Sequence, residues 1–210
     1  MESFEACSTA KAALFSCSPR PGGNSDQAAL LFAQGLHEVG GSGQTVVLRR
    51  HTVHPCVGCH RCEHDPDRAC FLASMDQSGR LFQLLQSAPL VFFASPIYFY
   101  HLPAIFKMFI DRGQSYFLRY QDKDKRLLAL PRRKAHVCLV AGRKRGEHLF
   151  EGSLLTLRYF LAPFNLELAE PLLLRGLDLP NDLANDPAAG AAVLEYGRAA
   201  WRELAQSPAC

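Results

Sequence analysis

Short apolar segments alternate with amphipathic segments along nearly the whole chain, and this alternation strongly constrains the fold. The segments that read as strands are residues 12–16, 45–48, 90–94, 135–140 and one within 166–174. The segment at 90–94 is continuously apolar, which is typical of a strand covered on both faces of a parallel sheet. Five strands alternating with helices predict a parallel sheet with helices on both sides.

The helices between these strands are predicted by capping residues and by the spacing of apolar side chains. Asn24 and Gln27 form a capping-box pattern at the start of the first helix. The later helices begin, in chain order, at Asp76, at Pro103, near residue 147 and at Asp186-Pro187. Right-handed crossovers leave few topologies for five such units. The commonest is the flavodoxin-like three-layer sandwich with strand order 2-1-3-4-5.

We expect a single domain over residues 1–210, with a Cys-rich insertion at about residues 51–74. Hydrophobic residues make up 48% of the chain and charged residues 20%, which is ordinary globular composition. The N-terminus is acidic where a signal peptide would be basic, and no segment approaches the ~20 apolar residues of a membrane span. We therefore expect a cytoplasmic protein that does not bind a membrane.

Charge is concentrated between residues 119 and 134, which hold seven basic and two acidic residues. We interpret this segment as a solvated loop. The alternative is a patch that attracts an anionic partner, such as a dinucleotide or an acidic electron carrier. The net charge of the chain is only +3 and no recognition motif accompanies it, so we expect no nucleic-acid partner.

The loop after the first strand, residues 16–25, has the components of a phosphate site. It offers hydroxyl groups, one arginine and backbone N–H groups near Gly22 and Gly23, and it leads into a helix N-terminus. It matches neither the P-loop nor the G-x-G-x-x-G pattern, which disfavours ATP, GTP and a Rossmann-type dinucleotide. A simple turn and helix cap would use the same residue types, so that alternative stays open.

The loop after the third strand contains three consecutive aromatic residues, Tyr98, Phe99 and Tyr100. Aromatic side chains at this position could form the wall of a site for a flat aromatic ligand. Alternatively, they could cover the end of the sheet or a subunit interface. A phosphate loop and an aromatic loop at one switch point of the sheet together suggest FMN.

Two segments resemble the NADPH-dependent FMN reductase superfamily. Residues 18–25 are similar to its S-P-R-x-x-G-N-S/T loop, and residues 95–99 followed by 109–112 to its S-P-V-Y-F and F-I-D-R segments. The resemblance implies a flavodoxin-like fold with non-covalent FMN. The FMN contacts that it implies are Ser18, Arg20, Asn24 and Ser25 at the phosphate, Ser95, Pro96, Ile97, Tyr98 and Phe99 at the ribityl chain and ring, and Gly142 in the third flavin-contacting loop.

Four cysteines in the pattern Cys56-x2-Cys59-x2-Cys62-x7-Cys70 give the strongest chemical signal. Such spacing places three thiolates in a tight loop, as iron–sulfur clusters require. At this place in the chain it resembles the iron–sulfur flavoprotein branch, which implies a [4Fe-4S] cluster held by these four cysteines. The interleaved histidines leave a Cys/His zinc site open. A lid or oligomer contact that binds no metal is the third alternative.

Together these features predict an FMN-dependent oxidoreductase or electron-transfer flavoprotein with a [4Fe-4S] cluster. NAD(P)H is a candidate electron donor, and a ferredoxin-like carrier or a small molecule a candidate acceptor. The alternatives are a cluster-free NAD(P)H-dependent FMN or quinone reductase, and a non-enzymatic electron-transfer or zinc-stabilised binding protein. The cofactors would supply the chemistry, so we assign no catalytic side chain. The resemblance also implies a homo-oligomer, a dimer or a tetramer.

Overall fold

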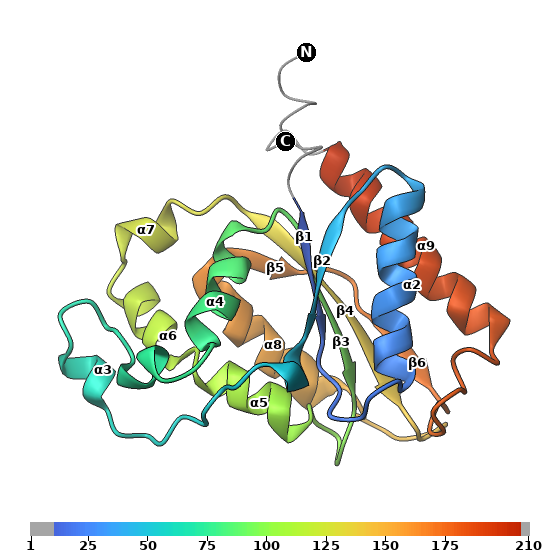
Figure 1. Ribbon diagram of the computed structural model, residues 1–210, viewed down its shortest axis with the longest axis horizontal. Coiled ribbons are helices and arrows are strands. Elements are labelled where there is room, and N and C mark those ends of the chain that lie inside the picture. The colour runs from blue at the N-terminus through green and yellow to red at the C-terminus, as the bar shows by residue number, and fades with distance from the viewer. Residues whose placement is uncertain (1–10, 207–210) are drawn as a thin grey trace.

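The computed structural model describes residues 11–206 and contains a parallel sheet between two layers of helices (Figure 1). The sheet order is β2 (Gly43–Val47), β1 (Ala12–Ser16), β3 (Val91–Pro96), β4 (Arg133–Ala141) and β5 (Leu166–Leu168). The predicted flavodoxin-like order 2-1-3-4-5 is therefore confirmed. A sixth strand, β6 (Leu172–Arg175), also pairs with β4, so the predicted last strand consists of two short segments.

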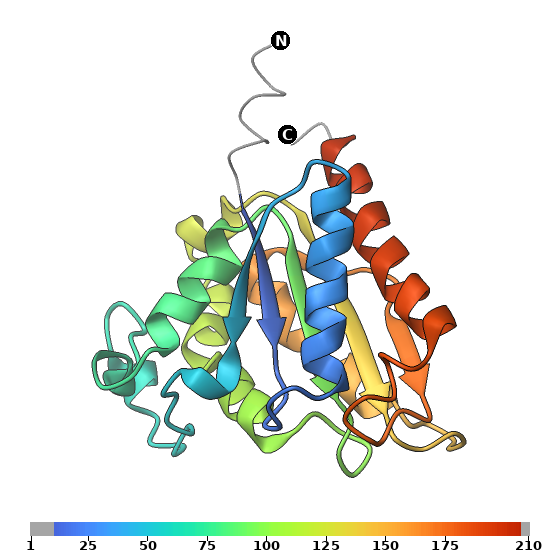
Figure 2. The same cartoon turned by 45° about the vertical axis from the view of Figure 1, so that its right-hand side comes forward.

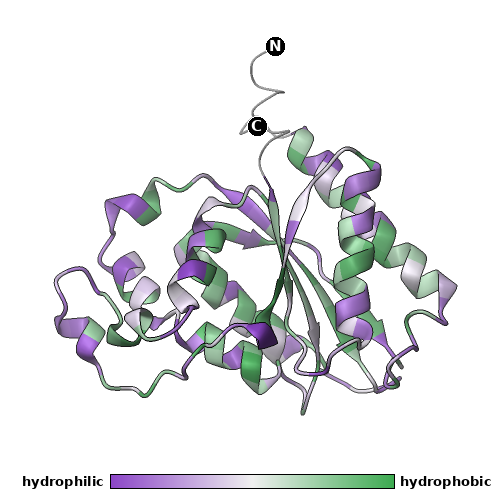
Figure 3. Ribbon diagram, in the orientation of Figure 1, coloured by the Kyte–Doolittle hydropathy of each residue, from purple (hydrophilic) through white to green (hydrophobic). Residues whose placement is uncertain are grey.

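Alternate residues of the central strands enter two separate cores, because successive side chains of a strand point to opposite faces. Leu14 and Phe92 lie in one core, beneath α2 (Asn24–Glu38) and α9 (Pro187–Ala205). Phe15 and Phe93 lie in the other. The helices that cover this second core are α4 (Ser78–Ser87), α5 (Ala104–Asp111), α6 (Gln114–Gln121) and α8 (Glu151–Leu161). Figure 3 shows the strands of the sheet coloured largely as apolar between these layers.

Helices α2 and α9 pack side by side on one face of the sheet (Figure 2). Glycines at the crossing permit their close approach: a Cβ at Gly35 would overlap the carbonyl oxygen of Leu194, and one at Gly197 that of Phe32. Asp186 caps α9 by accepting hydrogen bonds from the N–H groups of Ala188 and Ala189, as predicted. Helices α2 and α9 are thus locked together over β1 and β3.

The prediction of a solvated loop over residues 119–134 is wrong for most of that segment. It contains the end of α6, the short helix α7 (Lys125–Leu128) and the start of β4. Arg119 pairs with Asp124 at 2.7 Å, and buried Arg133 donates to the carbonyl oxygens of Ala88 and Phe164. Arg119 is therefore paired with a nearby carboxylate, whereas the partners of Arg133 are carbonyl groups of distant segments, which sequence spacing does not reveal.

Cys138 is a buried core residue of β4, as predicted, whereas Cys7 and Cys210 lie outside the described residues. Burial raises the pKa of the Cys138 thiol to about 12, which keeps it protonated and unreactive. None of the helices in residues 11–206 combines the length and the apolar character needed to cross a membrane.

Candidate functional site

Loops that follow β1, β3, β4 and β6 gather at the carboxyl edge of the sheet, the lower edge in Figure 2. They enclose what we call the switch-point cavity, with a volume of about 100 Å³. The FMN contacts implied by the sequence that line it are Ser18, Arg20, Asn24, Ser25, Pro96, Ile97, Tyr98 and Gly142. Segments up to 160 residues apart in the chain, such as those of Ser18 and Asp178, therefore meet here, as the topology of an open α/β sheet requires.

The N-terminus of α2 provides hydrogen-bond donors to the switch-point cavity. The backbone N–H groups of Asn24, Ser25 and Asp26 open the helix and have no acceptor among the described residues. Ser25 is buried beside them, and the Ser18 hydroxyl accepts the Arg20 backbone N–H at 3.1 Å, which tightens the loop. Unpaired N–H groups and the helix dipole make this end of α2 suited to an anion.

Asn24 is not the helix cap that the capping-box pattern predicts, because Gly23 occupies that position. The Asn24 amide nitrogen instead donates to the carbonyl oxygens of Leu177 and Leu179, at 3.2 and 2.9 Å. Its amide oxygen accepts the Leu183 N–H at 3.0 Å. The side chain thus fastens the loop after β6 to the start of α2, and only its backbone N–H is left to serve a ligand.

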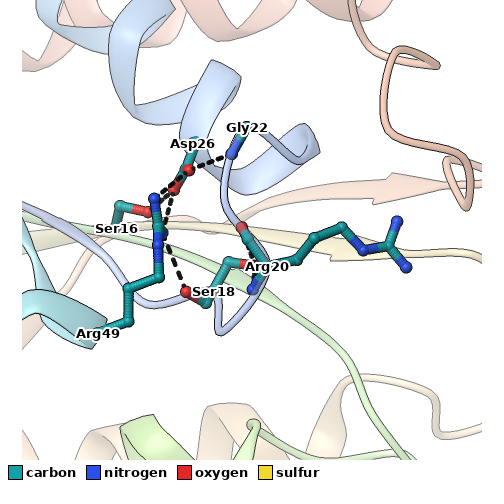
Figure 4. Close-up of polar contacts among 6 residues, drawn as sticks. All are labelled: Ser16, Ser18, Arg20, Gly22, Asp26 and Arg49. Atoms are coloured by element: carbon teal, nitrogen blue, oxygen red, sulfur yellow. Dashed lines mark hydrogen bonds and ion pairs between the residues drawn. The ribbon is translucent and has the colours of Figure 1, made fainter.

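A carboxylate in the first turn of α2 is neutralised by an arginine from the short 3-10 helix η1 (Leu48–Arg50), which follows β2 (Figure 4). Arg49 binds both carboxylate oxygens of Asp26, at 2.9 and 2.7 Å, and also donates to the Ser18 carbonyl. Burial alone would raise the pKa of Asp26, but hydrogen bonds from Arg49, Ser16 and Gly22 lower it below the ordinary value. In the same view Arg20 extends away from this pair.

The aromatic loop forms a tight turn at the mouth of the switch-point cavity. Tyr98 and His101 exchange two backbone hydrogen bonds, at 2.8 and 2.9 Å, and Phe99 and Tyr100 between them both have positive φ. Side chains at positive φ are strained, and such positions often occur at functional sites. Two implied FMN contacts do not line the cavity. Ser95 is buried beneath the loop, and the Phe99 side chain is fully exposed at the tip of the turn.

Gly142 lies where β4 ends and the backbone approaches the loop after β6. A Cβ at this position would lie 2.6 Å from the Asp178 carboxylate oxygen, so a larger residue would displace that loop. The Asp178 carbonyl in turn accepts a hydrogen bond from Arg20 at 3.1 Å. The third wall of the cavity is thus tied to the phosphate loop.

The Cys-rich loop is closed at its base by hydrogen bonds between its two ends. The Thr52 carbonyl oxygen accepts a hydrogen bond from the Gln77 backbone N–H, at 2.9 Å. The Asp76 carboxylate accepts one from the His54 backbone N–H, also at 2.9 Å. Arg112, at the end of α5, donates to both Asp76 and the His54 carbonyl. The Asp76 and Arg112 side chains are almost completely buried, so this ion pair fixes the loop to the rest of the molecule.

All four predicted ligand cysteines line a second cavity, of about 440 Å³, which we call the cysteine cavity. Partial burial raises the pKa of Cys62, and the neighbouring Cys70, Cys56 and Cys59 raise it further. In the described part of the chain, no three His, Cys, Asp or Glu side chains are placed to hold a metal ion. The two cavities share no lining residue, so the expected cluster site and flavin site are distinct.

The model of the NADPH-dependent FMN reductase family matches residues 10–149. The chain belongs to this family. The match spans the phosphate loop, the aromatic loop, the cysteines and the end of β4, and stops just before α8.

Individual relatives of this FMN reductase family member are distant. An iron-sulfur flavoprotein of Methanocaldococcus jannaschii is 27% identical over 111 residues, or 51% of this chain. The chain spans 54% of the length of that curated relative. Two solved structures share the fold. An NAD(P)H:quinone oxidoreductase from Methanothermobacter marburgensis has a TM-score of 0.64 and 18% identity, and the match covers 93% of this chain and 98% of that one. A Bacillus anthracis azoreductase has a TM-score of 0.59 and 14% identity, and the match covers 94% of this chain and 98% of that one.

Sequence reasoning missed the residues that hold the two sites in place. Asp26 in the first turn of a helix was a visible signal, but nothing local pairs it with Arg49 from another strand end. The same is true of Asp76 and Arg112, which are separated by 36 residues. The loop after β6, with Leu177 and Asp178 in the cavity wall, carries no recognisable motif.

Proposed function

We propose that this chain is an FMN-dependent oxidoreductase that accepts electrons from a reduced nicotinamide. The observation that carries the proposal is the meeting of the phosphate loop, the aromatic loop and Gly142 around the switch-point cavity. FMN supplies hydride and electron-transfer chemistry when it is bound. The residues of this chain bind and orient it.

The donor set at the N-terminus of α2 fits the phosphate of FMN. A phosphate dianion needs several hydrogen-bond donors and a positive potential. The unpaired N–H groups of Asn24, Ser25 and Asp26, the Ser25 hydroxyl and the Arg20 guanidinium would supply them. Asp26 would oppose binding were its charge not balanced by Arg49, which holds both of its oxygens.

The size of the switch-point cavity supports different locations for the parts of FMN. About 100 Å³ is below the ~300 Å³ of a typical small-molecule pocket, so only the phosphate and its neighbouring atoms fit inside. The flavin ring would lie across the mouth, where Tyr98 and the backbone of residues 96–98 offer an apolar wall and polar groups. This arrangement leaves one face of the ring open to a nicotinamide.

We further propose that the cysteine cavity holds a [4Fe-4S] cluster. Four thiols in one cavity favour iron–sulfur chemistry, and 440 Å³ leaves room for a cluster larger than a single ion. Buried Arg112 also lines this cavity, and its Nε has no hydrogen-bond partner among the described residues. A cytoplasmic location would keep these thiols reduced.

The cluster assignment is tested by Cys59→Ser, with Cys138→Ala as the matched control outside the loop. Both variants are purified without oxygen and assayed for iron, acid-labile sulfide and FMN. Cys59→Ser should lose most of its iron and sulfide and keep FMN, because the two cavities are distinct, and Cys138→Ala should keep all three. Full iron and sulfide in Cys59→Ser would contradict the ligand assignment.

Other outcomes on the same samples identify the alternatives. Iron-free wild-type protein that steadily oxidises NAD(P)H would indicate a reductase without a cluster. Zinc at one ion per chain, together with no NAD(P)H oxidation, would indicate a zinc-stabilised binding protein.

A further inference from the structure

A third cavity lies at the amino edge of the sheet, the upper edge in Figure 2, where β3 and β4 begin and α9 ends. Its volume is about 680 Å³, within the ~300–1,000 Å³ typical of small-molecule sites, and we call it the amino-edge cavity. Leu90, Ala200 and Leu204 contribute apolar surface to its wall. It shares no lining residue with the switch-point cavity or the cysteine cavity, so neither proposed cofactor accounts for it.

The amino-edge cavity is lined by a buried histidine that lacks a hydrogen-bond partner. His136, in β4, is only 3% exposed, and its Nδ1 has no partner in the part of the chain that the structure describes. Burial lowers the pKa of His136 to about 4, so the ring is neutral near pH 7. Most buried polar atoms in folded proteins are hydrogen-bonded, because an unpaired one is destabilising. The wall of this cavity therefore contains a hydrogen bond that has not been made.

A buried arginine in the same wall carries a charge that no carboxylate balances. Arg133 is 8% exposed, and its three guanidinium nitrogens donate to the carbonyl oxygens of Pro131, Ala88 and Phe164. It forms no ion pair within residues 11–206. Burial lowers the pKa of Arg133 to about 10, so it stays charged at neutral pH. Carbonyl groups satisfy its N–H donors but supply no counter-charge, and a buried charge without one is unfavourable.

The other charged side chains that line the amino-edge cavity neutralise one another. Arg132 pairs with Glu167 at 2.7 Å, and Lys134 pairs with Glu203. The wall thus holds three cations and two carboxylates, and the two ion pairs leave Arg133 unbalanced. The cavity therefore carries one net positive charge, on the most deeply buried of its charged residues.

We propose that the amino-edge cavity binds an organic monocarboxylate with an apolar body. The single uncompensated charge of Arg133 attracts one negative charge, and the neutral ring of His136 offers a hydrogen bond. The apolar surface described above packs against the body of the ligand. A free phosphate dianion suits this wall less well, because it would leave a surplus negative charge and cover no apolar surface.

The proposed ligand is distinct from any substrate of the flavin. Strand β4 passes from Arg133, in the wall of the amino-edge cavity, to Val140, in the wall of the switch-point cavity. These residues lie roughly 20 Å apart along the strand, at about 3.3 Å per residue. Electron transfer by hydride requires contact between the reacting atoms. Binding at the amino-edge cavity is therefore independent of the proposed function.

The test compares 4-phenylbutyrate with 4-phenylbutyramide, an uncharged molecule of the same shape, by calorimetry on the whole chain saturated with FMN. Wild type should bind the acid at least about tenfold more tightly than the amide. Arg133→Met should bind the acid no better than the amide and should bind the amide as wild type does. The matched control Arg158→Met removes an exposed arginine of α8 that does not line the cavity, and it should keep the preference.

A second variant leaves Arg133 in place and keeps the test decisive if the loss of that arginine disturbs folding. Leu204→Trp puts a larger side chain in the cavity wall, so both ligands should bind at least about tenfold more weakly. Leu155→Trp, at an exposed position of α8, is its control and should bind both as wild type does. Urea unfolding of each variant identifies any that is destabilised.

Four results would overturn the proposal. They are a wild type that binds neither ligand, a wild type that binds both equally, a folded Arg133→Met that keeps the preference for the acid, and wild-type affinities in Leu204→Trp. Because Gln206 also lines the cavity, a chain that ends at this residue is measured as well. If only the shortened chain binds the acid, the end of the chain itself competes for the cavity, and the proposal is wrong. A protein that holds no FMN would overturn the proposed function alone, since these measurements can be made without flavin.

Discussion

Asp26 places a negative charge in the first turn of α2, beside the cavity proposed for a phosphate, and Arg49 balances it. Arg49→Met should weaken FMN binding by at least about tenfold, or ~1.4 kcal/mol, because the freed carboxylate would repel the phosphate. Arg49→Met/Asp26→Asn should recover most of the lost affinity. Quenching of FMN fluorescence on titration with apoprotein measures the FMN affinity of both variants. Wild-type affinity in Arg49→Met would show that charge balance here does not matter.

His136 lies in the core between Phe32 and Tyr196, and burial lowers its pKa to about 4, from about 6.5 in an unfolded chain. Between these values the unfolded chain takes up a proton that the folded protein does not. Stability therefore falls as the pH falls through this window, by roughly 2 kcal/mol at pH 5. Urea unfolding at pH 7.5 and 5 should show this loss reduced in His136→Gln and unchanged in His148→Gln, an exposed control. Equal losses in both variants would contradict it.

At the scale of elements, the crossing of α2 and α9 depends on Gly35. Gly35→Ala should destabilise the protein by about 1–3 kcal/mol, because the new methyl group would overlap the Leu194 carbonyl and push the helices apart. Gly190→Ala, in α9, is the matched control: the nearest atom to its Cβ lies 3.9 Å away, so it should be neutral or stabilising by up to ~1 kcal/mol. Urea unfolding of both variants measures these changes in the free energy of unfolding. An unchanged free energy of unfolding in Gly35→Ala would contradict the prediction, because it would show that the two helices can accommodate the methyl group without loss of stability.

The elements were largely predictable because their signals are local. Apolar runs such as 90–94 and the Asp186 cap identify strands and helix starts from a few adjacent residues. Cap and loop assignments failed where distant partners decide the structure. Asn24 forms hydrogen bonds with residues more than 150 positions away instead of capping α2. Buried Arg133 donates hydrogen bonds to carbonyl oxygens of two other segments. Most of the candidate site was predicted by motif, and the side chains that support it were not.

At the scale of the whole molecule, two cavities with different chemistry lie on one α/β frame. The switch-point cavity combines the N-terminus of α2 with the aromatic turn. The cysteine cavity lies in a loop anchored by the Asp76–Arg112 pair. A flavin at the first and a cluster at the second would exchange two-electron for one-electron transfer within one chain. The proposed function depends on the flavin.

The most direct measurement is the flavin content of the protein purified without oxygen. Protein purified in this way, or incubated with FMN and desalted, should show a flavin absorption spectrum and contain about one FMN per chain. Addition of NADPH should bleach that spectrum. Protein that carries no flavin and takes up none from added FMN would contradict the central claim.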